Sequence, residues 1–390
     1  MSSVCLYFQV HQPYRLRRYS VFDSTSSYFD DEANARILKR VADRCYRPAT
    51  TLLLELLRRH AGQFHVAFSI TGTALEQLEQ HAPDVVQLFQ QLAATGQVEF
   101  LAETYHHSLA FLYSRDEFRA QVDLHRQAMH RLFGLDPQVF RNTELIYNND
   151  LAAEAAALRF RAVLTEGWNE VLGDRSPDQL YRAAHLPNLK LLLRNYQLSD
   201  DISFRFARTD LPDWPPTPEK FAAKLAARKA PAPLCNLFMD FETFGEHQHE
   251  PTGIFKFLEQ LPAVLLAAGH TFKTPSQTIA SETSAEPLDV PNTISWADST
   301  RDLSAWLGNA MQTHAMKELF RLEEPIKNCS DPQLLDDFRK LTTSDHVYYM
   351  STKHYADGQV HSYFNPYDSP YDAYINLMNV MDNLRSRIQA

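Results

Sequence analysis

Short apolar runs alternate with amphipathic segments over the first two-thirds of the chain. The apolar runs predict strands at Val4–Val10, Phe64–Ile70, Val98–Leu101, Gln138–Asn142, Ala162–Thr165, Leu189–Arg194, Leu234–Phe241 and Thr271–Lys273. Amphipathic segments between them predict helices, among them one from Pro48 to His60 and one from Pro83 to Gly96. Ser114, with Glu117 three residues later, predicts a capping box at the start of a helix that ends at Gly134.

The order strand, helix, strand, helix with short connections predicts an α/β fold with a parallel sheet. Seven or eight such units in one run favour a (β/α) barrel, and the glycine-rich first turn typical of a doubly wound sheet is missing. A polar, proline-containing segment over residues 276–292 predicts a linker. Helical patterns follow at Thr300–Leu322, Pro332–Leu341 and Pro370–Ile388. We therefore expect a catalytic barrel over residues 1–277 and a helical C-terminal domain over residues 278–390.

The net charge of the chain limits the classes of partner that it could bind. The formal net charge is −10 over 390 residues, which disfavours nucleic acid and anionic membrane surfaces, because both attract clustered Lys and Arg. A neutral polymer such as a glucan remains compatible with this charge. The sequence does not predict the oligomeric state.

The four cysteines and the N-terminal segment bear on the compartment. Cys5, Cys45, Cys235 and Cys329 are scattered and form no CxxC pair, as in a protein of a reducing compartment without a zinc knuckle. No apolar stretch approaches the ~18 residues of a membrane span. The first residues are typical of a strand rather than of a signal peptide. We expect a cytoplasmic protein.

Polar side chains follow three of the predicted strands directly. His11 comes after the first strand, Glu144 after the fourth, and Asp240 at the end of the apolar run that starts at Leu234. Barrel enzymes keep their active sites at the C-terminal ends of the strands, so these three residues are candidates for chemistry. The structural alternatives are that His11 belongs to a plain turn and that Glu144 pairs with Arg141 or caps the helix at Asp150.

Asp240 is the better candidate for an acid. Phe241 and Phe244 flank it, and desolvation against aromatic rings raises the pKa of a carboxyl group. Glu242 lies two residues on and would raise that pKa further by repulsion. A carboxyl that is neutral near pH 7 can act as a general acid. The alternative is an ordinary surface loop that carries two acids.

Two carboxylates at different strand ends, one shielded and one polar, are the pattern of a glycosidase. Carboxyl groups about 5–5.5 Å apart retain the anomeric configuration, and a gap of about 6.5–9.5 Å inverts it.

The segment after the third predicted strand holds further candidates. Glu99 and His107 could contact a sugar or serve the fold, and His106 with His107 and an acid could hold a metal ion. No GxSxG elbow, GxxxxGK[ST] loop or HExxH helix is present in the sequence.

Five segments together resemble glycoside hydrolase family 57, which contains α-amylases, 4-α-glucanotransferases, amylopullulanases and branching enzymes. They are His11-Gln12-Pro13, Gly96-Gln97-Val98-Glu99, Asn142-Thr143-Glu144-Leu145-Ile146-Tyr147, Asp240-Phe241-Glu242-Thr243-Phe244-Gly245 and Trp296–Asn309. Their order matches the five motifs of the family, and the spelling of the third and fourth looks most like the α-amylase branch. The sequence departs at Gln9, where many members have a histidine.

The resemblance implies an incomplete TIM-like (β/α)7 barrel with a helical C-terminal region and no cofactor or metal. It implies that Glu144 is the nucleophile and Asp240 the general acid/base of a retaining mechanism. It also implies that His11 and Glu99 bind the sugar at the cleavage point. The further candidates for sugar binding are His107, Glu242, Trp296, Asp298 and Trp306. For Trp306 the structural alternative is a core position in the helix that follows Thr300.

The sequence thus predicts a retaining hydrolase of α-1,4-glucans. A 4-α-glucanotransferase or branching enzyme would use the same two acids with a sugar as acceptor, and longer products from maltoheptaose would distinguish it. A glucan-binding protein without turnover and a metal-dependent polysaccharide deacetylase are the alternatives from other classes. Binding without product would identify the first, and sensitivity to a chelator the second.

Overall fold

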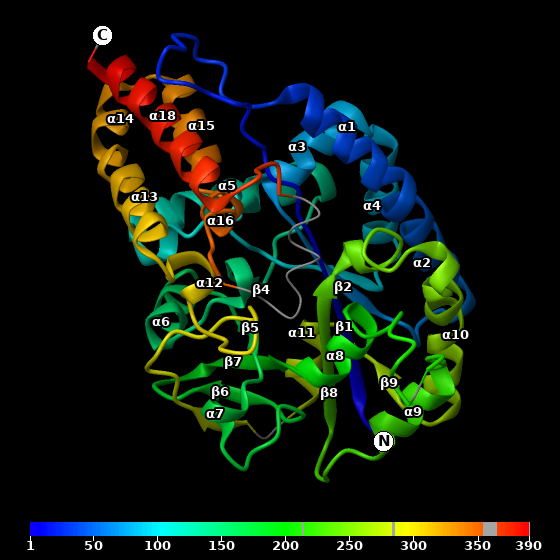
Figure 1. Cartoon of the computed structure of the whole chain (residues 1–390). Coiled ribbons are helices and arrows are strands. Elements are labelled where there is room, and N and C mark those ends of the chain that lie inside the picture. Colours follow the sequence, from blue (N-terminus) through cyan, green and yellow to red (C-terminus); the bar gives the residue numbers. More distant parts are fainter. Residues whose placement is uncertain (213, 283–284, 354–364, 390) are drawn as a thin grey trace.

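Seven parallel strands form most of a barrel in the computed structural model, which describes residues 1–212, 214–282, 285–353 and 365–389 (Figure 1). They are β1 (Ser3–Val10), β2 (Val66–Ile70), β3 (Val98–Phe100), β4 (Val139–Arg141), β5 (Ala162–Glu166), β7 (Leu186–Arg194) and β8 (Leu234–Asp240). One sheet has the order β3-β2-β1-β8, and the other contains β7-β5-β4.

The two sheets meet on both sides. A parallel bridge joins Ala102 to Phe140, and the backbone N–H of Asn195 donates to the carbonyl of Asn236 at 2.9 Å. Among the described strands no continuous ladder joins β3 to β4 or β7 to β8, so the barrel is incomplete. The predicted (β/α)7 barrel is confirmed.

The interior and the outer face of the barrel follow the two-residue period of β1. Val4, Leu6 and Phe8 pack outward against the surrounding helices, whereas Cys5 and Tyr7 lie with Phe238 in the interior. Every residue of β1 is buried, as expected for a parallel strand covered on both faces.

Three short strands complete the sheets. β6 (Tyr181–Ala183) runs antiparallel to β7, β10 (Glu286–Leu288) runs parallel to β6, and β9 (Thr271–Phe272) pairs with the start of β1. The linker predicted at residues 276–292 is wrong, because it contains β10 and most of a helix, and Leu288 and Val290 are buried. The domain boundary after residue 277 stays a prediction.

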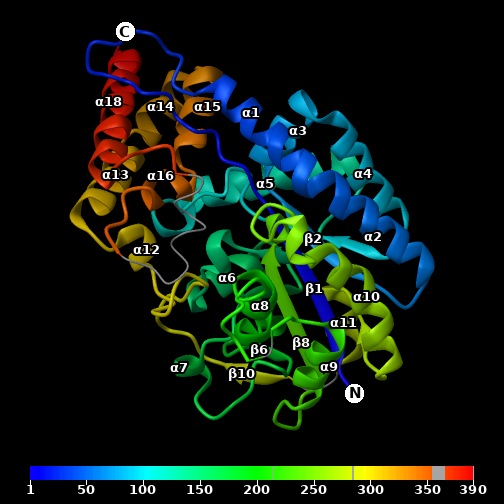
Figure 2. The same ribbon diagram turned by 45° about the vertical axis from the view of Figure 1, so that its right-hand side comes forward.

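Helices lie around the outside of the strands, and those of the C-terminal region gather at one end of the molecule (Figures 1 and 2). Those of the barrel part are α1 (Asp31–Val41), α2 (Arg47–Arg59), α3 (Gly72–His81), α4 (Pro83–Ala94), α5 (Arg115–Phe133), α6 (Asn149–Ala157), α7 (Asn169–Leu172), α8 (Tyr196–Ser203), α9 (Pro218–Ala226), α10 (Ile254–Ala267) and α11 (Pro275–Ser281). Those of the C-terminal region are α12 (Ser304–Leu307), α13 (Ala310–Arg321), α14 (Glu323–Cys329), α15 (Pro332–Leu341), α16 (Ser344–Tyr348) and α18 (Pro370–Gln389).

Two predicted helix features differ in the structure. The helix expected at Thr300–Leu322 is divided, because Asn309 caps α13 in a capping box with Gln312. The capping box expected at Ser114 is half formed. The Ser114 hydroxyl accepts from the N–H of Glu117, but the Glu117 carboxylate pairs with Arg339 on α15 at 2.8 Å. The long-range ion pair replaces the local cap.

The C-terminal helices lie at the end of the molecule opposite the N-terminus (Figures 1 and 2). A backbone bridge joins Ser108 to Thr343, and the N–H of Ser344 donates to the carbonyl of His107 at 2.9 Å. The start of α16 is therefore fixed against the loop that follows β3. None of the helices in the described ranges is long and apolar enough to cross a membrane.

Candidate active site

A pocket opens where β1, β4 and β8 end, and the C-terminal region forms its opposite wall. The residues that line it are Gln9, His11, Gln12, Pro13, Arg15, His107, Glu144, Arg194, Ser203, Phe204, Met239, Asp240, Glu242, His247, Trp296, Ala297, Asp298, Ala305, Trp306, Asp345, Tyr348 and Tyr349. Eight of the nine predicted site residues are among them. Glu99 is the exception.

The backbone at Glu144 is unusual. Glu144 and Leu145 have φ values of 57° and 50°, in the left-handed region that residues other than glycine rarely adopt. His107, Asp298 and Arg301 also have positive φ values. Such conformations cost about 1–3 kcal/mol each and gather at functional sites. The turn after β4 thus holds the Glu144 carboxylate in a geometry that an ordinary helix start would not give.

Three side chains from distant segments hold the Glu144 carboxylate. Trp296 Nε1 donates to Oε2 at 2.8 Å, and Ser344 Oγ donates to Oε1 at 2.9 Å. His107 Nε2 lies 3.3 Å from Oε1. Burial would raise the pKa of Glu144, but the hydrogen bond and positive charge of His107, with the charge of Arg141, lower it to about 2. Glu144 is therefore an ionised, oriented carboxylate.

His107 is the charged partner in this arrangement. It lies between Glu103 and Glu144, with each ring nitrogen 3.3 Å from a carboxylate oxygen. Burial lowers the pKa of His107, but the two acids outweigh burial and raise it to about 9. The sequence did not single out Glu103, whereas the structure makes Glu103 the counter-ion of His107.

His11 differs from His107 in charge although their rings stack at 4.0 Å between centroids. Its Nδ1 faces the hydroxyl of Thr71 and its Nε2 faces Asp345 Oδ2, both at 3.0 Å. Burial and the neighbouring positive His107 lower the pKa of His11. A neutral His11 thus stands beside a protonated His107 at the floor of the pocket.

Asp240 and Glu242 form the other acidic edge of the pocket. Asp240 ends β8 in register with Gln9, and Glu242 follows in a short 3₁₀ turn, where the hydroxyl of Tyr46 donates to it. Burial, and then repulsion from Asp240, raise the pKa of Glu242 to about 8. The raised pKa expected at Asp240 stays a prediction, and the structure adds one at its neighbour Glu242. This edge of the pocket carries a proton at neutral pH.

A π-helical turn at Ala42–Tyr46 positions this edge from outside. It directs Tyr46 to Glu242 and Cys45 Sγ to the carbonyl of Phe241. Such turns are frequent at functional sites.

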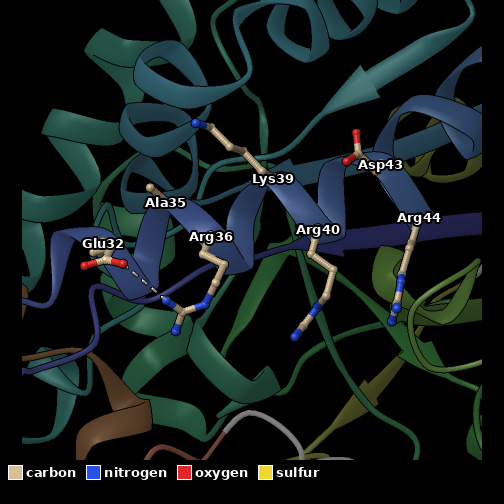
Figure 3. A pocket seen from close by; sticks show the side chains of 7 residues that line it. All are labelled: Glu32, Ala35, Arg36, Lys39, Arg40, Asp43 and Arg44. Carbon is tan, nitrogen blue, oxygen red and sulfur yellow. Dashed lines mark ion pairs between the residues drawn. The ribbon is translucent and has the colours of Figure 1, made fainter.

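Two arginines, one on α1 and one on the π-helical turn, hold the loop that follows β8. Figure 3 shows Arg36, Arg40 and Arg44 extending to the same side, along a surface hollow that contains neither catalytic candidate. Arg40 pairs with the buried Glu246 at 3.1 Å, and Arg44 reaches it at 3.9 Å. The loop after β8 is therefore held by charge.

Gly245 allows this loop to pass close to the π-helical turn. Its φ is +113°, and an added Cβ would lie 1.9 Å from the carbonyl oxygen of Arg44. We expect Gly245→Ala to lower the free energy of unfolding by about 3 kcal/mol or more, with loss of activity. Gly134→Ala is the control, because it shares a positive φ but has no atom within 4 Å of its Cβ. It should cost about 1 kcal/mol. Urea unfolding of both variants would measure this, and equal losses would contradict the close-approach argument.

The helical region supplies residues that sequence reasoning missed. Ser344 and Asp345 stand at the start of α16, where a serine and an aspartate look like an ordinary helix start. Their partners, Glu144 and His11, lie 200 and 334 positions earlier in the chain. Only the tertiary fold reveals this connection.

The predicted residues of the fifth segment have different surroundings. Trp296 is bonded to Glu144, as described above. Asp298 accepts from the N–H and hydroxyl of Thr300, and Lys353 lies 3.4 Å away, so it also organises its own turn. Trp306 lines the pocket but is only 1% exposed. The structure therefore agrees with the core position, and a contact between Trp306 and sugar stays a prediction.

Glu99 lies apart from the pocket. Its carboxylate accepts from the N–H and hydroxyl of Ser276 at 2.8 and 2.6 Å, and β3 places it level with Ala67. Glu103 comes four residues later, roughly 13 Å further along an extended chain. The acid at the end of this segment is therefore Glu103, and the structure does not bring Glu99 to the site.

His106 does not line the pocket, unlike His107. Burial lowers the pKa of His106 to about 3, and its ring packs on Tyr105. Over the residues that the structure describes, no group of three or more His, Cys, Asp or Glu side chains is placed to hold a metal ion.

Comparison with known proteins agrees with the barrel and with the family that the motifs indicate. The family model described as "Glycosyl hydrolase family 57" matches residues 5–291. A protein of Methanocaldococcus jannaschii named "Putative alpha-amylase" is 41% identical over 391 residues, which covers 96% of this chain and 82% of that protein.

Two solved structures share the fold at low identity. The branching enzyme of Thermococcus kodakaraensis superposes with a TM-score of 0.71 at 14% identity, over 99% of this chain and 90% of its own. The 4-alpha-glucanotransferase of Thermococcus litoralis gives 0.70 at 13% identity, over 97% of this chain and 59% of its own. The expected family is confirmed: the chain belongs to glycosyl hydrolase family 57 and is a glycoside hydrolase.

Proposed function

We propose that this enzyme hydrolyses α-1,4-glucans with retention of configuration, as an α-amylase-like enzyme. The observation that carries the proposal is the meeting of two acidic edges in one pocket. Glu144 is held ionised by His107, Trp296 and Ser344, and Asp240 lies beside the proton-carrying Glu242. The name of the M. jannaschii relative supports the substrate.

In the first step, Asp240 donates its proton to the glycosidic oxygen while Glu144 attacks the anomeric carbon. The bond from carbon to the leaving oxygen breaks, and an ester to Glu144 forms. In the second step, Asp240 takes a proton from water, the water oxygen attacks the same carbon, and the electron pair of the ester bond returns to Glu144.

The other residues position and bind. Glu242 stays neutral near pH 7 and lines the pocket, where its carboxyl can hydrogen-bond a sugar hydroxyl. Trp296 and Tyr348 offer aromatic surface to the sugar rings. His11 is neutral and presents a hydrogen-bonding edge. Glucan chains are the expected partner, and no step of this mechanism draws on a cofactor.

Time-resolved NMR of maltoheptaose cleavage tests the proposal. Retention gives the α-anomer as the first product, before mutarotation, whereas an initial β-anomer would exclude a glycosyl-enzyme on Glu144. Chromatography of the same reaction tests the acceptor. We expect products shorter than maltoheptaose, and products longer than it would identify a transferase instead.

A further inference from the structure

Arg141 is a buried charge that the mechanism above does not use. It ends β4, it is 0% exposed, and none of its three guanidinium nitrogens has a hydrogen-bond partner among the described residues. A guanidinium keeps its charge inside proteins. Burying a charge without hydrogen bonds costs several kcal/mol. The fold therefore carries a cost that a neutral side chain of similar size would avoid.

The surroundings of Arg141 indicate what this charge acts on. Its Cζ lies 4.8 Å from the ring centroid of Trp296, whose Nε1 donates to Glu144. Arg194 approaches the same ring at 5.8 Å. The indole is thus held by cation–π attraction while its N–H points at the nucleophile.

The charge also acts through space. The titratable groups that face Arg141 are Glu103, Glu144, His107 and Tyr7. Its positive charge lowers the pKa values of all four. Those that face Glu144 are His107 from the loop after β3, Arg141 from β4 and Asp345 from α16. Asp345 opposes the two cations.

We propose that Arg141 is a positioning residue for the nucleophile, which orients Trp296 and stabilises the free carboxylate of Glu144 at a cost to the stability of the fold. The proposal rests on the proposed function, in which Glu144 forms and releases an ester. Glu144 is neutralised when the ester forms and regains its charge when water displaces it. A fixed cation nearby favours the release, because the returning electron pair arrives on a carboxylate that Arg141 stabilises.

Arg141→Met tests this with three readouts. We expect kcat on an aryl α-maltoside to fall about 10- to 100-fold, with the loss in the release of the glycosyl-enzyme. The acidic limb of kcat/KM should move up by about one pH unit, because Glu144 then protonates more readily. The thermal midpoint should stay equal or rise, since an unpaired buried charge has been removed. Arg141→Lys keeps the positive charge. The acidic limb of its kcat/KM profile should therefore lie closer to the wild-type position than that of Arg141→Met.

Arg126→Met is the matched control. Arg126 lies 4.2 Å from the Phe160 ring, outside the pocket, and its Nη2 donates to the carbonyl of Leu158. This variant should lose some stability and keep the wild-type pH profile, which is the opposite signature.

A lower thermal midpoint for Arg141→Met would overturn the proposal, because the guanidinium would then support the fold. An unmoved acidic limb would overturn it too, provided that Glu144→Gln is inactive. An active Glu144→Gln variant would instead reject the proposed function, so the two failures can be told apart.

Discussion

Glu144→Gln is expected to lower kcat/KM on maltooligosaccharides by about 10⁴- to 10⁶-fold while the barrel stays folded. The single amide oxygen can still accept from Trp296 Nε1, which now reaches Oε2 at 2.8 Å, and the amide NH2 can donate to the hydroxyl of Ser344, which now reaches Oε1 at 2.9 Å. It has no negative charge to attack the anomeric carbon or to balance His107. Initial rates with thermal unfolding in parallel would measure both effects. Glu32→Gln is the control, because the Glu32 side chain is 95% exposed on α1.

Chemical rescue makes the Glu144 prediction specific to a nucleophile. Glu144→Ala leaves space in which azide can attack α-maltosyl fluoride directly. One displacement inverts the centre, so the product should be the β-maltosyl azide. No rescue, or an α-azide, would show that Glu144 acts in another way.

The strand ends were predictable from sequence because they depend on local pattern. The apolar runs before His11, Glu144 and Asp240 end where the polar residues begin, and parallel strands bring such ends to one edge. The register between β1 and β8 places Gln9 beside Asp240, a pairing that the shared barrel edge makes reasonable. For these three residues, local pattern and tertiary structure agree.

The rest of the site depends on contacts that no local pattern records. Ser344 reaches Glu144 across 200 positions, and its own neighbourhood looks like a helix start. In sequence, Glu99 and Glu103 are both acids near the end of the third strand. Only the register of β3 shows that Glu99 lies away from the pocket while Glu103 lies at the end that faces it.

The protonation states of the acidic residues in the pocket could not be predicted from sequence, because they depend on burial in the folded protein. The sequence suggested a raised pKa at Asp240 from its aromatic neighbours. In the structure, burial raises the pKa of its neighbour Glu242 to about 8, a shift that the sequence did not single out. The positive φ of Glu144 is likewise invisible beforehand, since glutamate has no preference for that conformation.

Asp240→Asn should reduce turnover of natural glucans by about 10²- to 10⁴-fold, the usual contribution of a general acid. A sugar hydroxylate is a poor leaving group and needs the proton, whereas 2,4-dinitrophenolate leaves without one. The loss should therefore be small in the first step for a dinitrophenyl α-maltoside. Burst kinetics would show the glycosyl-enzyme accumulating, because the second step still lacks its base. Asp116→Asn, with an 89% exposed side chain on α5, is the control.

Azide rescue also distinguishes the role of Asp240 from that of Glu144. In Asp240→Asn the ester to Glu144 still forms, and azide needs no base to displace it. Two displacements retain configuration, so the product should be the α-maltosyl azide, opposite to that from Glu144→Ala. The same anomer from both variants would contradict the assignment of one nucleophile and one acid/base. Equal losses on glucan and dinitrophenyl substrates would move the proton donor from Asp240 to the neighbouring Glu242, the group on this edge whose pKa of about 8 keeps it protonated at neutral pH.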